Sequence, residues 1–152
     1  MTSNRLIPIV LVVLGLALVG AGCGGGDDNK SSPSLSKAEY IRRGNAICAA
    51  GNKAIEAKAG QLFGTKQRPS EGQLKQFAST VLLPSVEQQV AQLKKLSPPS
   101  GDEDKVKAIL DAADDGIDKG KQDPLSLTQE KGGPFDKANS LARAYGLTVC
   151  GS

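Results

Sequence analysis

The sequence contains no histidine. Histidine is the usual general base near neutral pH and the most common nitrogen ligand of transition metals. Its absence excludes hydrolases built on a serine–histidine or cysteine–histidine pair, and a zinc site would have to use thiolates and carboxylates. From the composition we therefore expect no catalytic residue, no metal site and no cofactor.

Aromatic residues are scarce as well, at 3% of the chain with no tryptophan. Proteins that bind nucleic acid combine clustered lysine and arginine with aromatic rings on which bases stack. Here the 19 basic and 16 acidic residues are scattered along the chain. Both observations argue against nucleic-acid binding, and the shortage of rings leaves the core to small and aliphatic side chains.

The apolar run near the N-terminus is short for a membrane-spanning helix. It covers residues 6–19, follows the single charge of Arg5 and gives way to the small residues 20–22. A spanning helix needs about 20 apolar residues. This layout is typical of a cleaved signal peptide over residues 1–22, with a retained membrane anchor as the alternative.

Cys23 stands between those small residues and the segment GGGDD at 24–28. This stretch resembles the lipobox and spacer of bacterial lipoproteins. The resemblance implies a diacylglyceryl group, with its two acyl chains, on the Cys23 thiol, cleavage just before it, and a further acyl chain such as palmitate on the new amine. Because two acyl chains hold a protein stably at a bilayer, we expect anchoring on the outer face of the cell membrane. Signal cleavage without lipidation is the alternative.

Three cysteines are an odd number for an exported protein, in which an unpaired thiol is a liability. Lipidation of Cys23 leaves Cys48 and Cys150 as the only pair, and we predict a disulfide between them. The loop of about a hundred residues that it closes is worth at most ~4.7 kcal/mol in the chain-entropy model. Two separate buried thiols are the alternative, although an oxidising environment favours the bond.

Capping signals predict where three helices begin. In each, a serine is followed three residues later by glutamate or glutamine, which is the capping-box spacing. The pairs are Ser36 with Glu39, Ser70 with Gln73, and Ser100 with Glu103. Apolar residues recur at spacings of three and four after each pair, and no alternating strand pattern of useful length is present.

Proline and glycine complete the fold prediction. We expect the second helix to kink just before Pro84, or to divide there, because proline lacks an amide hydrogen and clashes with the carbonyl four residues back. A short fourth helix begins near Pro134 and ends at Gly146 as its left-handed cap. The prediction is an all-α, four-helix bundle over residues 36–152, preceded by a flexible, lipid-anchored tether at 23–35.

Gly44 and Gly51 flank Cys48 on one face of the first helix. An interior glycine costs about 1 kcal/mol relative to alanine, so the pair indicates the close approach of another segment. The C-terminal tail with Cys150 is the expected neighbour. Glycines that are merely tolerated on a surface are the alternative.

Three segments together resemble a loose group of small, cysteine-paired lipoproteins from high-GC Gram-positive bacteria. They are AEYIRRGNAICAAGNKAI, LKKLSPPSGDEDKVKAIL and ARAYGLTVC. The resemblance covers most of residues 20–151. The group is uncharacterised, so the resemblance implies a cysteine-paired helical lipoprotein and carries no activity over.

Two groups of charged residues are candidates for ion binding. The acidic group is Asp111, Asp114, Asp115 and Asp118, and the basic group is Arg42, Arg43, Lys94 and Lys95. One straight helix cannot surround a calcium ion with six or more oxygens, so we interpret the acidic group as a solvated face without a metal. We interpret the basic group in the same way, with contact to anionic lipid or wall polymers as the alternative.

For function, we expect a non-enzymatic binding or interaction module whose protein or envelope partner the sequence does not name. An enzyme that uses carboxylates alone would need two of them to face each other in a cleft. A carrier of a small apolar ligand would instead contain a cavity. The residues expected to line it are Val86, Val90, Leu110 and Ile117.

The anchor can be tested by the substitution Cys23→Ser. We expect the wild-type mature chain to begin at Cys23 and to sediment with membranes, because its acyl chains insert there. The variant should appear in the medium or persist as an uncleaved precursor, as measured by fractionation and intact-mass analysis. Unchanged processing and membrane retention of the variant would contradict lipidation at this residue.

Overall fold

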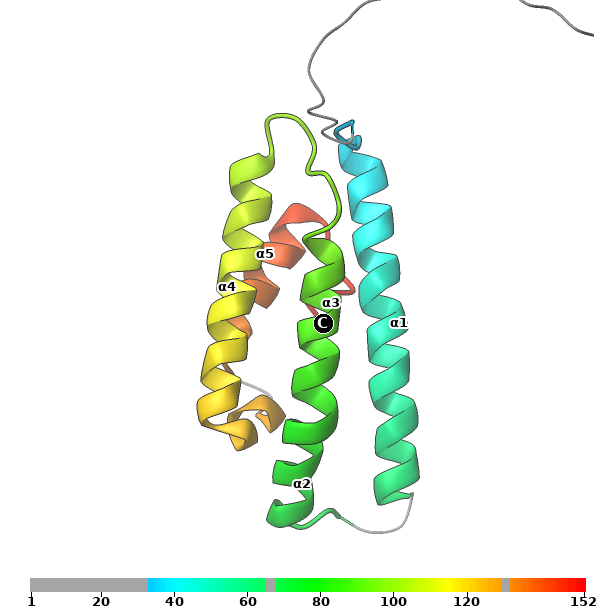
Figure 1. The fold of residues 1–152 in the computed structure, drawn as a ribbon, viewed down its shortest axis with the longest axis vertical. Coiled ribbons are helices and arrows are strands. Elements are labelled where there is room, and N and C mark those ends of the chain that lie inside the picture. The colour runs from blue at the N-terminus through cyan, green and yellow to red at the C-terminus, as the bar shows by residue number, and fades with distance from the viewer. Residues whose placement is uncertain (1–32, 65–67, 130–131) are drawn as a thin grey trace, which may run out of the picture. The chain divides into compact units, whose positions relative to one another are not determined.

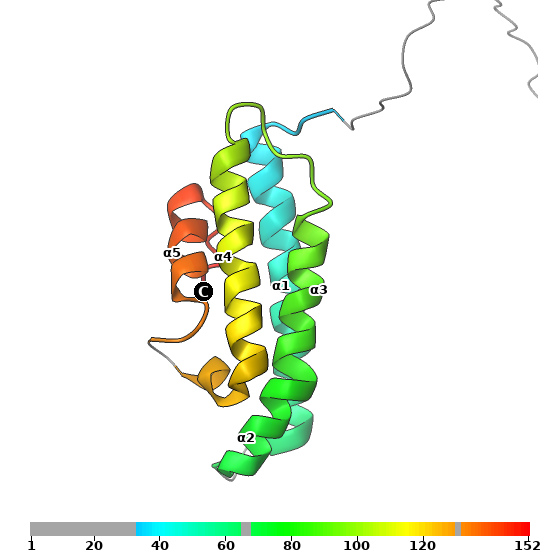
Figure 2. The same cartoon turned by 60° about the vertical axis from the view of Figure 1, so that its left-hand side comes forward.

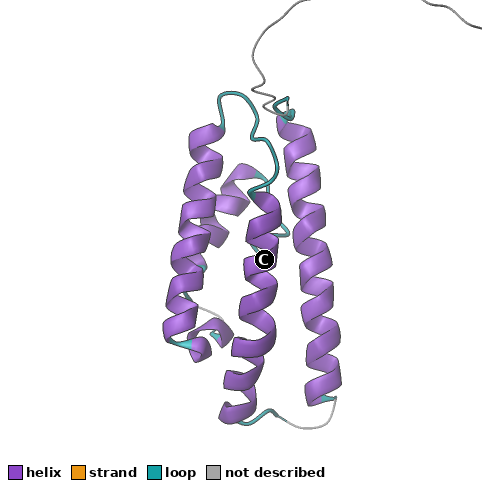
Figure 3. Cartoon of the chain, in the orientation of Figure 1, coloured by secondary structure: helices purple, strands orange, loops and turns teal. Residues whose placement is uncertain are grey.

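The computed structural model describes residues 33–64, 68–129 and 132–152. The predicted signal peptide, Cys23 and most of the tether lie outside these residues. Within them the chain is helical and contains no strand (Figure 3). The elements are α1 (Lys37–Phe63), α2 (Glu71–Phe77), a π-helical segment (Ala78–Leu82), α3 (Leu83–Leu93), α4 (Glu103–Gln122), a 3-10 helix (Pro124–Thr128) and α5 (Asp136–Tyr145).

The described residues form the all-α bundle that the sequence predicts. The segments α2, π and α3 follow one another without a break, so they count as one long helix among four. Helix α1 packs against α3, α3 against α4, and α4 against α5. The short α5 lies behind α3 and α4 in Figure 1 and beside α4 in the turned view of Figure 2. No helix in the described part of the chain is long and apolar enough to cross a membrane.

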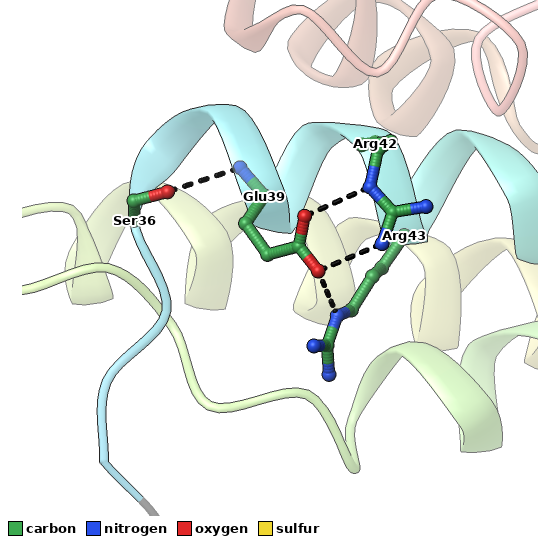
Figure 4. Close-up of polar contacts among 4 residues, drawn as sticks. All are labelled: Ser36, Glu39, Arg42 and Arg43. Carbon is green, nitrogen blue, oxygen red and sulfur yellow. Dashed lines mark hydrogen bonds and ion pairs between the residues drawn. The ribbon is translucent and has the colours of Figure 1, made fainter.

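The predicted caps are confirmed at α2 and in part at α1. At α2, the Ser70 amide donates to Gln73 Oε1 at 2.9 Å and the Gln73 amide donates to Ser70 Oγ at 3.3 Å. At α1, Ser36 Oγ accepts from the Glu39 amide at 3.2 Å. The Glu39 carboxylate does not complete this box, because it binds Arg42 and Arg43 instead (Figure 4).

The capping box predicted at Ser100 is wrong. Helix α4 begins at Glu103 with Asp102 as its N-cap residue. Gly101 adopts a positive φ of 85°, which turns the chain and leaves Ser100 outside the helix. The Glu103 carboxylate accepts from the Gly101 amide at 2.7 Å, so the acidic side chain still stabilises this end of the helix.

The interruption predicted before Pro84 is confirmed, and it takes the form of a π-helical segment. In an α-helix the Pro84 ring would press against the carbonyl of Thr80. Here the helix widens over Ala78–Leu82, and the Leu83 amide donates to the carbonyl of Ala78. This π-helical hydrogen bond spans one residue more than an α-helical one, and it lets the helix continue past the proline.

Two clusters of buried side chains form the core. One gathers around Tyr40 and Tyr145, whose rings meet edge to face with centroids 6.1 Å apart. Leu35 packs against this cluster, so the packed region begins inside the segment predicted as tether. The other cluster is rich in alanine. It comprises Val90, Ala112, Ala113, Ile117 and Ala138.

The predicted disulfide is present. Cys48 on α1 is bonded to Cys150, and their Cα atoms lie 5.1 Å apart. A Cβ on Gly44 would lie 2.5 Å from Leu147 Cδ2, so this glycine does allow the C-terminal segment to approach α1. For Gly51 the prediction that the C-terminal segment is its neighbour was wrong. The Gln89 side chain of α3 lies against it, because α3 runs along α1 beyond the point where the C-terminal segment reaches that helix.

Breaking this disulfide should destabilise the bundle. In a chain that carries Cys23→Ser, we expect dithiothreitol to lower the free energy of unfolding by about 2–4 kcal/mol, since the bond closes a loop of 102 residues. Urea titration measures the difference. The same chain with Cys48→Ala and Cys150→Ala is the control and should not respond to dithiothreitol. Equal stability with and without reductant would contradict the structural role of the bond.

Candidate functional site

A cavity of about 170 Å³ lies among the helices, beside the disulfide. All four helices and the C-terminal segment contribute to its lining. Its larger apolar side chains are Val86, Val90, Leu93, Ile109, Leu110 and Phe135. Cys48 and Cys150 also line it, which places the covalent bond in the cavity wall.

Small residues explain why there is space at this point. Ala113 on α4 and Ala138 and Ala142 on α5 are all buried and all line the cavity. Alanine ends at Cβ, so none of them reaches across. The Phe135 ring lies directly against α4, because a Cβ on Gly116 would be 2.5 Å from its Cδ1 atom. The volume is thus bounded by one ring and several aliphatic side chains, with alanines between them.

Besides Ser152, whose hydroxyl donates to the Val149 carbonyl, three amide side chains interrupt this apolar lining. They belong to Asn52 on α1, Gln89 on α3 and Asn139 on α5, and each residue is half-buried. Within the described residues none of these side chains makes a hydrogen bond. Among the described residues that line the cavity there is no aspartate, glutamate, lysine or arginine. The site therefore offers apolar contact and uncharged hydrogen-bonding groups.

The C-terminal segment that closes one side is held by polar contacts as well as by the disulfide. Asn45 Nδ2 donates to the Gly146 carbonyl at 3.2 Å, and the Val149 amide donates to Asn45 Oδ1 at 3.0 Å. The Arg143 guanidinium donates to the Gly151 carbonyl. Gly146 itself is the left-handed cap of α5 that the sequence predicts, with φ of 112°.

The structure places three of the four residues expected for a carrier in this cavity. Val86, Val90 and Leu110 line it, whereas Ile117 is buried in the alanine-rich cluster and does not.

Sequence reasoning missed the three amides. Asn52 follows Cys48 by one helical turn, and Gln89 lies beside Val86 and Val90 on the inner face of its helix. Their positions therefore carried a signal in the spacing of three and four residues. That signal is easily passed over, because polar residues on amphipathic helices usually face water.

The four aspartate side chains of the acidic group on α4 do not come together at one point. Asp111 pairs with Lys107 at 2.5 Å and Asp114 pairs with Lys94 at 2.7 Å, while Asp115 and Asp118 are exposed. Among the described residues no three or more histidine, cysteine, aspartate or glutamate side chains come together in a way that would hold a metal ion.

Most of the basic group is neutralised by acidic neighbours. The Arg42 guanidinium donates twice to the Glu39 carboxylate, each time at 2.8 Å, and Arg43 Nε donates at 2.5 Å (Figure 4). Hydrogen bonds from Arg42 and then Arg43 lower the pKa of Glu39 to about 2. Lys94 forms an ion pair with Asp114, and Lys95 is exposed.

A second polar cluster joins the start of α1, the start of α4 and the end of α5. Tyr145 donates its hydroxyl to Asp102 Oδ2 at 3.1 Å, and Asp102 also pairs with Lys105 at 2.6 Å and Lys37 at 3.5 Å. Burial first, and then the Asp102 carboxylate, raise the pKa of Tyr145 to about 12. A tyrosine that holds its proton so firmly suits a structural contact better than proton transfer.

Comparison of the chain with protein-family models, with curated proteins and with solved structures gives no match.

The raised pKa of Tyr145 predicts an alkaline loss of stability. The unfolded chain ionises this hydroxyl near pH 10, whereas the folded chain keeps the proton to about pH 12. The unfolded state is therefore favoured progressively over that range, and the free energy of unfolding should fall with rising pH. Tyr145→Phe should make the fall shallower in urea titrations between pH 9 and 12. The same slope in both chains would contradict the assignment.

Proposed function

We propose that this chain is a lipid-anchored binding protein of the outer face of the cell membrane, which holds a small and largely apolar ligand in the cavity between its helices. The observation that carries the proposal is the cavity itself, with Val86, Val90 and Leu110 in its wall. Pockets that bind small molecules are typically apolar with a few polar groups at fixed positions, and this lining has that composition.

The size of the cavity limits the ligand. A buried apolar cavity of about 150 Å³ is enough to bind benzene. The volume here is about 170 Å³. A ligand with one six-membered ring, or a branched chain of similar bulk, fits such a space.

The chemistry of the lining favours binding over catalysis. General acid–base catalysis requires a titratable side chain within reach of the substrate. Among the described lining residues, the side chains that could ionise in principle are those of Cys48 and Cys150, and these are joined to each other. This supports a module that holds its ligand unchanged.

The predicted lipid anchor on Cys23 would locate the proposed function at the membrane surface. Lipidation of Cys23 would keep the bundle near the bilayer, because the 14 steps from Cys23 to Lys37 extend to at most about 50 Å. A small apolar compound partitions into membranes, so a protein tethered within this distance stays close to the bilayer that stores the compound. The proposed role is therefore capture or delivery at the membrane surface.

Cavity filling tests the proposal. Toluene is the probe, and the protein is the full chain with Cys23→Ser, so that no acyl chain competes with the probe. We expect toluene to raise the melting temperature and to shift the amide NMR signals of residues 86–93 and 109–113. Ala113→Leu places three further carbon atoms in the cavity and should weaken toluene binding at least ten-fold.

The matched control is Ala91→Leu, which makes the same change at an exposed position of α3. It should bind toluene like the parent chain. Absence of toluene binding to the parent chain, or equal binding to Ala113→Leu, would contradict the use of this cavity.

A further inference from the structure

We infer that the ligand carries one uncharged hydrogen-bonding group, such as a hydroxyl, a carbonyl or an amide, and that Asn52, Gln89 and Asn139 bind that group. The inference rests on the proposed function and specifies the chemical class of its ligand. The ligand would be a small neutral amphiphile, with its apolar part against Val90 and Leu110 and its polar group near the three amides.

The three amides come from helices that are distant in the sequence and that all line this cavity. Asn52 is on α1, Gln89 on α3 and Asn139 on α5. Each side chain provides a carbonyl acceptor and two N–H donors. All three residues are half-buried, and no hydrogen bond satisfies these side chains within the described part of the chain. Among the described residues no unpartnered side-chain nitrogen or oxygen is fully buried, so these amide groups are still reachable from solvent and are free to bind a ligand that carries a polar group.

The position of Gln89 depends on a glycine. A Cβ on Gly51 would lie 2.3 Å from both Cδ and Nε2 of Gln89, closer than side-chain atoms approach. Any other residue at position 51 would therefore displace the amide. Gly51 lies in the interior of α1, where glycine weakens a helix. Gly51 thus weakens α1 slightly, but it leaves the space that the Gln89 amide occupies beside Asn52.

The charge of the lining excludes two other ligand classes. In the part of the lining that the structure describes, no lysine or arginine is present to receive a carboxylate or phosphate, and no aspartate or glutamate to receive an amine. A charged group taken from water into this cavity would lose its hydration without gaining a counter-charge. The polar group of the ligand is therefore neutral.

Toluene and phenol separate this inference from the proposed function, because they are nearly the same size and differ by a methyl or a hydroxyl group. A cavity that offers only apolar contact should bind phenol at least ten-fold more weakly than toluene, since the hydroxyl loses its hydrogen bonds to water. With the amides as partners, phenol should bind at least as tightly as toluene. The dissociation constants are measured by NMR titration of the full chain with Cys23→Ser.

Substitution of the amides by apolar side chains of similar shape identifies the partners. Gln89→Met, Asn52→Leu or Asn139→Leu should raise the phenol-to-toluene ratio of dissociation constants, by about five-fold for each hydrogen bond lost. The control is Gln88→Met, the same change at the exposed neighbouring position of α3, which should leave the ratio as it is.

A measurement on the unsubstituted amides covers the case in which a variant fails to fold. The side-chain NH₂ signals of Asn52, Gln89 and Asn139 should shift with phenol and much less with toluene. Toluene binding together with phenol binding ten-fold weaker would overturn the inference and leave the proposed function standing. Failure of both probes to bind would overturn both.

Discussion

The disulfide between Cys48 and Cys150 joins the middle of the longest helix to the last residues of the chain, and the rest of the structure depends on that junction. It keeps Leu147 on Gly44 and the Val149 amide on Asn45. Helix α5 leads directly into this segment, so the same bond limits its movement away from α4. Much of the core is alanine, which buries little area per residue, and a covalent link compensates for the missing apolar contact.

Much of the fold followed from local signals. The caps at Ser36 and Ser70, the interruption before Pro84 and the left-handed Gly146 each depend on residues within a turn or two of one another. The disulfide followed from the parity of the cysteines. The error at Ser100 has a local cause too, since the capping spacing does not reveal that Gly101 turns the chain before the helix starts.

The cavity could be predicted only in part, because it depends on how the helices are placed relative to one another. That Val86 and Val90 face inward follows from helical spacing. Whether Leu110 or Ile117 faces the same space depends on how far α4 is shifted along α3, which the sequence of neither helix contains. The amides were harder to predict, since glutamine is usually a surface residue and the space that the Gln89 side chain occupies depends on Gly51 in another helix.

The C-terminal wall of the cavity depends on a bond between residues that are far apart in the sequence. Cys150 and Ser152 border the cavity, and the bond that holds them reaches back over 102 residues. Apart from Ser152, the other residues that line the cavity all lie between the two cysteines in the sequence. With the bond opened, this wall would be held by the hydrogen bonds of Asn45 and Arg143 and by the packing of Leu147. Reduction would therefore act on the shape of the cavity as well as on the stability of the fold, because the two sulfur atoms that hold the bundle together also hold one side of the cavity in place.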